Sequence, residues 1–438
     1  MIIRLVNRTI SSLILITTIS FANIVHSQTS YIDYQSPFHS TISEGAMVAS
    51  QNHLSSEIGI EIIKKGGNAV DAAVAVGFSL AVTLPRAGNL GGGGFMLIYM
   101  KDRDEILAID YRSQSPEGLT TDKIFGVNLP DEYKKANRDI VRYGYKASTV
   151  PGTVSGLILA HSQFGKLPLE VVMRPAIEQA REGVNVSYDL EQAIASAPQL
   201  SWDPESKRIY FHEGKPLKRG EVMKRPDLAN TMNQISMNGL KGFYDGEVAE
   251  KIASSMAIND GEITTDDLKK YRARFTQPIG VNYRGNKVYT HGPPSGGGIV
   301  LLTALKVLEY FDLGKIGSNS ATSYHLIAEA LRRGHNNRSH HVGDPSFYSV
   351  PYDQLMSNKR IKSFAKSISL KEASLAREVM PLSVLQESKN TTHYSIIDSE
   401  GNAVSNTYTL GYSFGSGVTI PGTGILMNNQ MNNFAYQY

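Results

Sequence analysis

Two adjacent threonines near the C-terminal end of the sequence have side chains that could do chemistry. They lie in the segment 390–395, which reads NTTHYS, and a third threonine, Thr409, ends the next run of strand-forming residues. A threonine hydroxyl is a weak nucleophile until a base takes its proton. A threonine in a strand is usually structural, so the pattern indicates at most a nucleophile that needs an activating group.

The segments that carry these threonines are expected to form a β-hairpin. Aromatic and β-branched residues are frequent in 394–397 and 404–408, and the turn between them contains Gly401. Alternation along the strands then sends every second side chain to the same face of a sheet.

The register of this hairpin depends on which residues pair beside the turn. If Asp398 pairs with Val404, the polar residues of both strands come together on one face. The pairs that follow are Thr391 with Gly411 and His393 with Thr409. The hairpin would then hold a small polar cluster where core residues would be expected.

Three segments resemble the start of the small subunit in the γ-glutamyltranspeptidases, namely NTTHYS at 390–395, TYTL at 407–410 and GILMNNQM at 424–431. Upstream segments agree, and the resemblance runs from about Gly45 to Phe434. In that family a precursor cleaves itself before a threonine, which becomes an N-terminal nucleophile. The threonine that aligns is Thr391, so the resemblance implies cleavage of the Asn390–Thr391 bond.

The chemistry that the resemblance implies is consistent with the properties of threonine. A freed N-terminal amine can act as the base for the hydroxyl of its own residue, and its reference pKa of about 7.7–8.0 leaves much of it available near neutral pH. Before cleavage, the Oγ of Thr391 can attack the carbonyl of Asn390 and shift the acyl group from nitrogen to oxygen, which leaves an ester for water. The resemblance also implies that Thr409 hydrogen-bonds and orients Thr391.

Arg112 is a candidate for binding a carboxylate of the substrate. It follows the strand-forming run 105–111, and a guanidinium has a planar fork suited to bidentate binding of a carboxylate. In the family, the arginine that binds the α-carboxylate follows an Ile-Asp-aromatic triplet. The sequence IDYR at 109–112 fits this pattern.

Two positions depart from the family pattern where the α-amino group of the substrate is expected to bind. The family usually has asparagine where Gly411 stands and an aspartate pair where Asn432 and Asn433 stand, whereas Gln430 is retained. A charge-assisted hydrogen bond is roughly twice as strong as a neutral one, and an amide supplies no charge. We therefore expect Gln430 and Asn433 to hold the amino end, but to hold glutamate-type substrates less tightly.

The segment 88–94, which reads GNLGGGG, invites comparison with a phosphate-binding loop. Such a loop should end in Lys-Ser/Thr and open a helix, whereas this one opens the strand-forming run 95–100. The glycines are better suited to letting the backbone approach another chain segment or a substrate. Ser295 lacks the Gly-x-Ser-x-Gly context of a hydrolase serine and is interpreted as a helix cap.

The composition excludes several classes of function. The sequence has no cysteine, which rules out disulfides, thiolate metal sites and cysteine nucleophiles, and its net charge of +3 is too small to indicate nucleic-acid binding. We expect no metal and no cofactor. His335, His340 and His341 belong to no patterned ligand set and are interpreted as surface histidines.

The N-terminal segment 1–27 has the features of a signal peptide. Arg4 and Arg8 precede an apolar run at 10–22, and VHS at 25–27 is a small-residue cleavage site. An uncleaved anchor is the alternative, although the apolar run is short for a spanning helix, and no later segment is long enough to cross a bilayer. We expect a periplasmic or secreted protein without a stable membrane span.

The remaining chain is expected to contain a large-subunit region, 28–390, and the start of a small-subunit region, 391–438. The polar segment 371–389, directly before the cleavage site, is the most linker-like part of the sequence. Small subunits of the family continue well beyond the position of Tyr438. Their further portion carries a serine pair that binds carboxylate and a Gly-Gly pair that forms the oxyanion hole, so we expect this chain to be C-terminally truncated.

The expected fold is the α+β, four-layer α-β-β-α sandwich of N-terminal-nucleophile hydrolases. The expected reaction is attack by Thr391 on a γ-glutamyl amide such as glutathione, after which the acyl group passes to water, an amino acid or a peptide. The partners are the donor, the acceptor and the two subunits of one precursor. Two alternatives remain: an acylase for glutaryl-type amides, favoured by Asn433, and an inactive remnant that only binds, favoured by the truncation.

Overall fold

The structure is a computed structural model that describes residues 41–125, 138–375 and 390–434. The chain divides into two compact units, Met1–Glu44 and Gly45–Tyr438. The predicted signal peptide lies outside the described residues, and so does most of the predicted linker. The following description concerns the second unit.

The strands of this unit are β1 Met47–Ala49, β2 Gly93–Met100, β3 Glu105–Tyr111, β4 Val184–Asn185, β5 Phe211–His212, β6 Lys215–Pro216, β7 Val222–Met223, β8 Arg274–Thr276, β9 Ile279–Tyr283, β10 Asn286–Thr290, β11 Thr392–Ile397, β12 Ala403–Thr409, β13 Thr419–Ile420 and β14 Ile425–Leu426. The α-helices are α2 His53–Lys64, α3 Ala69–Thr83, α4 Thr121–Phe125, α6 Thr153–Phe164, α7 Leu169–Glu182, α8 Tyr188–Ala195, α9 Pro204–Tyr210, α10 Pro226–Asn238, α11 Lys241–Tyr244, α12 Glu247–Ile258, α13 Thr265–Lys270, α14 Gly296–Leu308, α15 Leu313–Ile316, α16 Ala321–His341, α17 Tyr352–Leu355 and α18 Asn358–Lys366. A 3-10 helix, η5 Gln430–Asn433, follows β14.

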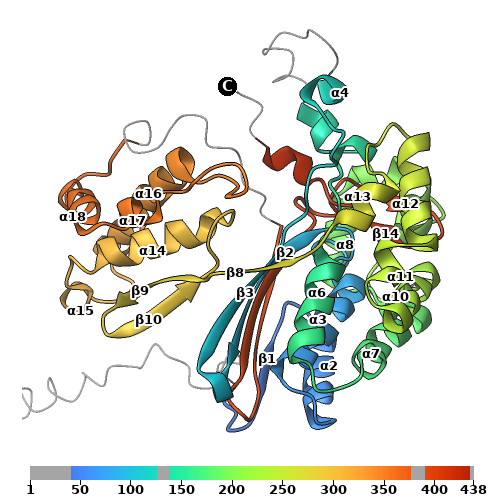
Figure 1. Cartoon of the computed structure of the whole chain (residues 1–438), viewed down its shortest axis with the longest axis horizontal. Coiled ribbons are helices and arrows are strands. Elements are labelled where there is room, and N and C mark those ends of the chain that lie inside the picture. Colours follow the sequence, from blue (N-terminus) through green and yellow to red (C-terminus); the bar gives the residue numbers. More distant parts are fainter. Residues whose placement is uncertain (1–40, 126–137, 376–389, 435–438) are drawn as a thin grey trace, which may run out of the picture. The chain divides into compact units, whose positions relative to one another are not determined.

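The main sheet has six strands in the order β1-β11-β12-β2-β3-β8, and all neighbouring strands are antiparallel. The hairpin β11–β12 lies inside this sheet, between β1 and β2 (Figure 1). The region predicted as the start of a small subunit therefore shares one sheet with strands that lie about 300 residues earlier in the sequence.

Helices cover one face of the sheet because the strands alternate between apolar and polar side chains. In β11, Thr392, Tyr394 and Ile396 are buried while the residues between them are exposed. The buried side chains pack on α3, which is buried along its whole length, and α6 packs on β2 and β3. The predicted α+β class is confirmed. Of the predicted layers, the described residues form this sheet and the helices on its buried face.

The register of the hairpin differs from the prediction. Ile396, not Asp398, pairs with Val404, so each residue of β11 pairs with a residue two positions earlier in β12 than predicted. His393 lies opposite Thr407. The faces are the same in both registers because the repeat of a strand is two residues.

The cause is a tighter turn in which Asp398 participates. Its backbone N–H donates to the carbonyl of Asn402 over 3.0 Å, and its Oδ1 accepts the backbone N–H groups of Glu400 and Asn402 over 3.0 and 2.9 Å. A carboxylate that binds backbone groups a few residues ahead stabilises a turn. Asp398 is therefore a turn residue, which shifts the pairing toward the start of β12.

A second, smaller hydrophobic core lies among α14, α16 and α18, next to the hairpin β9–β10 (Figure 1). The helix α16, with 21 residues, runs through this group. Its buried apolar residues Leu326 and Ala330 pack against residues of α14 and α18.

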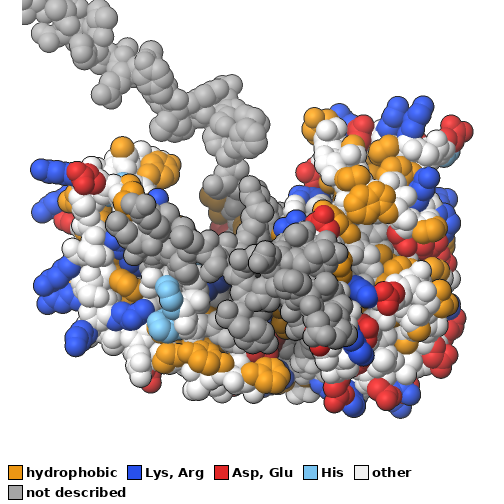
Figure 2. All heavy atoms as spheres, turned by 90° about the horizontal axis from the view of Figure 1, so that it is seen from above, with side chains coloured by type: hydrophobic (Ala, Val, Ile, Leu, Met, Phe, Trp, Pro, Cys, Tyr) orange, Lys and Arg blue, Asp and Glu red, His pale blue; other side chains and the backbone are white. Residues whose placement is uncertain are grey.

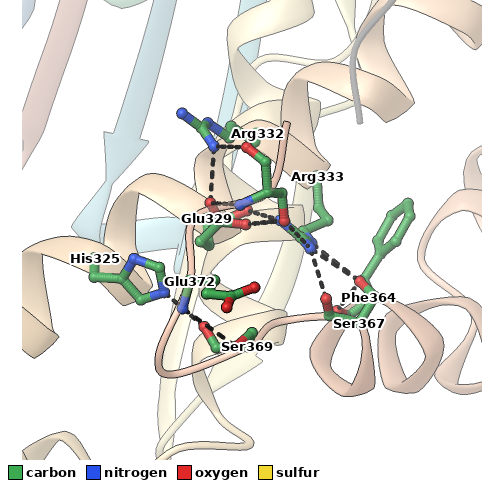
Figure 3. A network of polar contacts seen from close by, with 9 residues as sticks. His325, Glu329, Arg332, Arg333, Phe364, Ser367, Ser369 and Glu372 are labelled. Carbon is green, nitrogen blue, oxygen red and sulfur yellow. Dashed lines mark hydrogen bonds and ion pairs between the residues drawn. The ribbon is translucent and has the colours of Figure 1, made fainter. Parts of the chain in front are cut away.

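A buried ion pair fixes the orientation of α16 (Figure 3). Both Glu329 and Arg333 are almost fully buried, and the guanidinium of Arg333 donates to the carboxylate of Glu329. Arg332 donates to the other carboxylate oxygen over 2.9 Å. Ser374 donates to Glu329 through its backbone N–H (3.1 Å) and its hydroxyl (2.6 Å), and Arg333 also binds Ser367. The segment after α18 is thus attached to α16.

The surface of the molecule shows charges of both signs. In Figure 2, hydrophobic side chains lie in separate groups among acidic and basic ones, as expected for a net charge of only +3. Among the described residues, no helix has the length and apolar character needed to cross a membrane.

Candidate active site

Four positions on neighbouring strands form a row across the face of the sheet that the helices leave uncovered. Thr409 at the end of β12 pairs with Gly93 at the start of β2. Continuing the registers by one residue places Thr391 beside Thr409 and Arg112 beside Gly93. Neighbouring strands lie about 4.8 Å apart, so the row spans about three such spacings. Since Gly93 has no side chain, the space between the threonines and the arginine stays open.

A cavity of about 510 Å³ lies over this row. Its lining includes every predicted catalytic or substrate-binding residue, namely Arg112, Thr391, Thr409, Gln430 and Asn433, and also Gly411, where the sequence departs from the family pattern. The opposite wall comes from α14 and α16 and includes Ser295, Leu331, His335 and Arg338. The volume suits a small peptide or amino-acid derivative.

Thr409 contacts the carbonyl of the bond that is predicted to break. Its Oγ1 donates a hydrogen bond of 2.9 Å to the carbonyl oxygen of Asn390 and accepts the backbone N–H of Gly411 over 3.0 Å. Among the described hydrogen bonds of the uncleaved chain, none joins Thr409 to Thr391, so the orienting role of Thr409 stays a prediction for the cleaved protein. In the continuous chain the hydroxyl of Thr409 therefore contacts the carbonyl group of Asn390.

Gln430 connects η5 to both sides of the row. Its Nε2 donates to the carbonyl of Thr409 over 3.0 Å, and its Oε1 accepts the hydroxyl of Ser113. An amide has two N–H donors and two acceptor lone pairs, so one of each remains for a ligand. Asn433 lies at the other end of η5, is exposed, and lines the cavity.

The glycine at 411 is required by its surroundings. Its φ of +103° lies in the region that favours glycine, and a Cβ there would stand 2.1 Å from the Oδ1 of Asn429. That oxygen is occupied, because it accepts the backbone N–H of Tyr412 over 2.9 Å. The departure from the family at this position thus belongs to the local backbone and cannot be reversed by substituting asparagine alone.

The glycine-rich segment brings β2 close to β12, as predicted. A Cβ at Gly92 would stand 2.2 Å from the carbonyl oxygen of Thr409, and one at Gly94 would stand 2.3 Å from that of Thr407. Any side chain at these positions would force the strands apart. The segment therefore fixes Thr409 relative to β2 and opens a strand, not a phosphate-binding helix.

Arg112 presents a guanidinium that makes no hydrogen bond or ion pair with any described residue, although it lines the cavity. The neighbouring carboxylate of Asp110 is already used. Its Oδ1 accepts the backbone N–H of Arg112 over 3.0 Å, and its Oδ2 accepts Arg274 over 3.0 Å. Burial lowers the pKa of Arg112, while Asp110 and Asp344 act in the opposite direction. A partly buried guanidinium without a partner among the described residues favours the binding of an anion.

His335 and Arg338 on α16 were not identified from the sequence as site residues. The interpretation of His335 as a surface histidine is wrong, since it lines the cavity together with Arg338. Burial lowers the pKa of both side chains, and the neighbouring charges of Arg338 and Arg112 lower them further. The spacing of Leu331, His335 and Arg338, at i, i+4 and i+7 of one helix, could have indicated a shared face.

Ser295 occupies the N-cap position of α14, as predicted for a helix start, but its side chain makes no capping hydrogen bond and lines the cavity. Among the described residues, no group of three or more histidine, aspartate or glutamate side chains could hold a metal ion.

Comparison with known proteins shows the same family along nearly the whole second unit. The family model described as Gamma-glutamyltranspeptidase matches residues 55–438. A glutathione hydrolase proenzyme from Escherichia coli strain K12 is 42% identical over 402 residues, covering 91% of this chain and 68% of the relative. An acylase ACY 1 proenzyme from Pseudomonas sp. strain SE83 is 35% identical over 392 residues, covering 89% of this chain and 69% of the relative.

Solved structures agree with these relatives. The γ-glutamyltranspeptidase of Helicobacter pylori superimposes with a TM-score of 0.72 at 35% identity, covering 80% of this chain and all of that one. The cephalosporin acylase of Bacillus halodurans superimposes with a TM-score of 0.78 at 27% identity, covering 92% of this chain and 74% of that one. The fold is that of the N-terminal-nucleophile hydrolases. With its threonine row, its arginine and these matches, the chain belongs to the γ-glutamyltranspeptidase (glutathione hydrolase) family.

Proposed function

We propose that this protein hydrolyses or transfers the γ-glutamyl group of glutathione and similar amides through a Thr391 acyl-enzyme, after cleaving itself between Asn390 and Thr391. The observation that carries the proposal is the hydrogen bond from Thr409 to the carbonyl of Asn390, in a cavity that also holds Thr391 and Arg112. Self-cleavage needs a nucleophile and a polarised carbonyl, and turnover needs in addition a group that binds the carboxylate of the donor.

Self-cleavage begins with attack of the Thr391 Oγ on the carbonyl carbon of Asn390. The developing negative charge lies on the oxygen that Thr409 already contacts, so this hydrogen bond strengthens as the tetrahedral intermediate forms. Collapse breaks the C–N bond and leaves an ester between Asn390 and the Thr391 Oγ. Water hydrolyses the ester and frees the amine of Thr391.

Turnover uses the same hydroxyl with the freed amine as base. The amine takes the proton of the Thr391 Oγ, which attacks the γ-carbonyl of the donor while Arg112 holds the α-carboxylate. The proton passes to the leaving amine. The γ-glutamyl ester then reacts with water, or with the amino group of an amino acid or peptide.

Glutaryl-type amides form a second candidate substrate class, favoured by the charge of the cavity. Among the described residues that line it there is no aspartate or glutamate, and Asn433 offers an amide where an ammonium group would need a counter-charge. The γ-glutamyl and glutaryl substrate classes share every catalytic step. They differ only in whether the α-carbon carries an amino group.

The arrangement of the chain in the cell forms part of the proposal. We propose that residues 1–27 direct export to the periplasm or the cell exterior, and that the two pieces released by self-cleavage stay associated. The position of β11 and β12 inside the main sheet supports the second point, because separating the pieces would break both flanking strand pairings.

The test combines mass analysis with two chromogenic substrates. Intact-mass analysis should show two pieces, the second beginning at Thr391, and the same cut in Thr391→Ala would contradict self-cleavage because no hydroxyl would remain to attack. Purified protein is then assayed with γ-glutamyl and glutaryl anilides. Hydrolysis of the first supports the proposed function and hydrolysis of the second alone supports the alternative, whereas hydrolysis of neither by cleaved protein overturns both.

A further inference from the structure

Asn428 lies between β14 and η5, is fully buried, and makes five hydrogen bonds through its side chain. Its Nδ2 donates to the carbonyl oxygens of Gly91 over 2.7 Å and Thr149 over 2.8 Å. Its Oδ1 accepts the hydroxyl and the backbone N–H of Thr149, over 2.7 and 3.0 Å, and the backbone N–H of Gln430 over 3.0 Å. Both donors of the amide and its oxygen are therefore in use.

These partners fix which chemical group can occupy position 428. Turning the amide over would place its N–H groups against other N–H groups and its oxygen against two carbonyl oxygens. A carboxylate could accept from the same N–H groups, but it could not donate to the two carbonyls. A buried polar group that loses its partner costs about 1–3 kcal/mol, so the surroundings favour a neutral amide.

The same bonds join the glycine-rich segment 88–94 to the end of the described chain. The carbonyl of Gly91 also accepts the backbone N–H of Asn428 over 3.1 Å. A Cβ at Gly91 would stand 2.2 Å from the carbonyl oxygen of Leu426, so the two backbones are in direct contact. Gly91 and Thr149 precede the proposed cleavage site and Asn428 follows it, so the bonds of this amide cross between the two pieces.

Gln430 is held through both its main chain and its side chain. Asn428 accepts its backbone N–H, Ser113 donates to its Oε1, and the carbonyl of Thr409 accepts from its Nε2. A group that recognises a ligand must be held within about 0.5 Å of the productive position. The amide of Asn428 thus sets the place from which Gln430 meets a ligand in the cavity.

We propose that Asn428 is a positioning residue for the amino end of the substrate, which acts through Gln430 and does so only as a neutral amide. It is not among the described residues that line the cavity, so it acts without touching the ligand. This inference rests on the proposed function for the ligand, because Gln430 is expected to hold the amino group of a γ-glutamyl substrate. It also gives the glycine-rich segment a second role, since Gly91 holds Asn428.

The test replaces the amide by a carboxylate of nearly the same shape, in Asn428→Asp. The carboxylate would face the carbonyl oxygens of Gly91 and Thr149, so burial and these two oxygens should raise its pKa. Once protonated, the new side chain can donate to one of the two carbonyls. An effect that comes from the lost donors should therefore decrease as the pH falls.

The ligands are L-glutamate and glutarate, which differ only in the α-amino group. Neither contains the amide bond that the proposed reaction breaks, so neither is consumed. Dissociation constants are measured by calorimetry on the full chain at pH 8 and pH 5.5. At pH 8, Asn428→Asp should weaken L-glutamate at least about tenfold and glutarate less than about threefold, whereas at pH 5.5 the loss for L-glutamate should shrink.

Asn68→Asp is the matched control. Asn68 is also a buried amide that accepts two backbone N–H groups, those of Val70 and Asp71, and donates to a distant carbonyl, that of Phe164. It lies at the start of α3 and outside the described lining of the cavity. This variant should leave the ratio of the two dissociation constants unchanged at both pH values.

A milder variant, Thr149→Val, removes one donor to Asn428 and keeps the backbone N–H. It should weaken L-glutamate more than glutarate without recovery at low pH, and it replaces Asn428→Asp if that variant does not fold. Hydrogen exchange of the segment 426–433, measured by mass spectrometry, gives a readout that needs no ligand. Exchange should be faster in the variants within this segment and unchanged elsewhere.

The outcomes separate the inference from the proposed function. Equal weakening of both ligands, or a loss for L-glutamate in Asn428→Asp that is the same at both pH values, overturns the positioning role. If L-glutamate does not bind to the unsubstituted protein, the γ-glutamyl function is contradicted and hydrogen exchange decides. Faster exchange confined to 426–433 then supports the positioning of Gln430, and unchanged or uniformly faster exchange overturns it.

Discussion

The hydroxyl of Thr409 donates a hydrogen bond of 2.9 Å to the carbonyl oxygen of Asn390, the acyl side of the bond before Thr391. The two residues are 19 positions apart and meet because the β11–β12 hairpin places the strand ends side by side. The backbone N–H of Gly411 donates to the same hydroxyl, and Asn390 is the closer of its two acceptors, because the carbonyl oxygen of Gly411 lies 3.4 Å away. The donor is in place before any reaction begins.

Replacing this donor should slow self-cleavage. Thr409→Val keeps the shape of the side chain but removes the hydroxyl, and loss of one such donor typically costs about 10²–10³ in rate. Thr409→Ser should retain most of the rate. The measurement is the fraction of cleaved protein over time by intact mass, and equal rates in the valine and serine variants would show that the hydrogen bond does not assist.

Substitution of Arg112 should affect binding more than chemistry. Arg112→Lys keeps a positive charge but loses the bidentate fork, so KM for γ-glutamyl substrates should rise severalfold or more while kcat changes little. Arg274→Lys is the matched control, because Arg274 pairs with Asp110 next to Arg112 and does not line the cavity. An unchanged KM in Arg112→Lys rules out the carboxylate clamp.

Restoring a carboxylate at 433 should shift specificity toward substrates with an amine. Asn433→Asp supplies a counter-charge to the α-ammonium, and the gain for γ-glutamyl substrates should be about 1.5–3 kcal/mol in kcat/KM. Glutaryl substrates should become worse, since a methylene cannot satisfy a carboxylate. Asn432→Asp serves as the control, because Asn432 donates to the hydroxyl of Tyr412 and is not part of the lining. If both substrates shift equally in Asn433→Asp, residue 433 does not recognise the amine.

The buried pair on α16 should contribute to stability in a pH-dependent way. Burial alone raises the pKa of Glu329, but hydrogen bonds from Ser374 and Arg333 outweigh it and lower the pKa below its usual value. The contribution is therefore present above the unfolded pKa of about 4.3 and is lost as the pH falls through the folded value.

Glu329→Gln leaves Arg333 buried without its partner and should destabilise the fold by about 3–5 kcal/mol at pH 7. The loss should shrink as the pH falls below about 4. Urea unfolding at pH 7, 5 and 3.5 measures this, with the exposed Glu372 as control in Glu372→Gln. A destabilisation that is the same at all three pH values would contradict the assigned ionisation of Glu329.

Several features follow from local sequence. The run of small and branched residues in α3 predicts a helix that is buried all round, and it is. The glycines before β2 predict a close approach of two backbones, and Arg112 directly after β3 predicts a guanidinium at a strand end. The period of two in the hairpin fixes which residues share a face with Thr391. In each case the determining interactions lie within a few residues of one another.

The features that the sequence did not reveal depend on contacts between distant segments. A shift of two residues leaves the polar and apolar faces of a hairpin unchanged, so the pattern could not distinguish the pairing of His393 with Thr409 from the observed pairing with Thr407. The hydrogen bonds that Asp398 makes within the turn determine the observed register. The same register brings the hydroxyl of Thr409 within hydrogen-bond distance of the carbonyl of Asn390.

The orientation of the helix α16 also depends on contacts between distant segments. This helix is polar on more than one side, so its sequence does not tell which arginines meet a buried carboxylate and which face a cavity. The packing of Glu329 and Arg333 against the segment after α18 fixes the rotation of the helix. That rotation directs His335 and Arg338 toward Thr391. By itself the sequence identified Thr391 and Arg112 as candidates, and both line the cavity, whereas the tertiary packing of a helix that is polar on several sides brought His335 and Arg338 there.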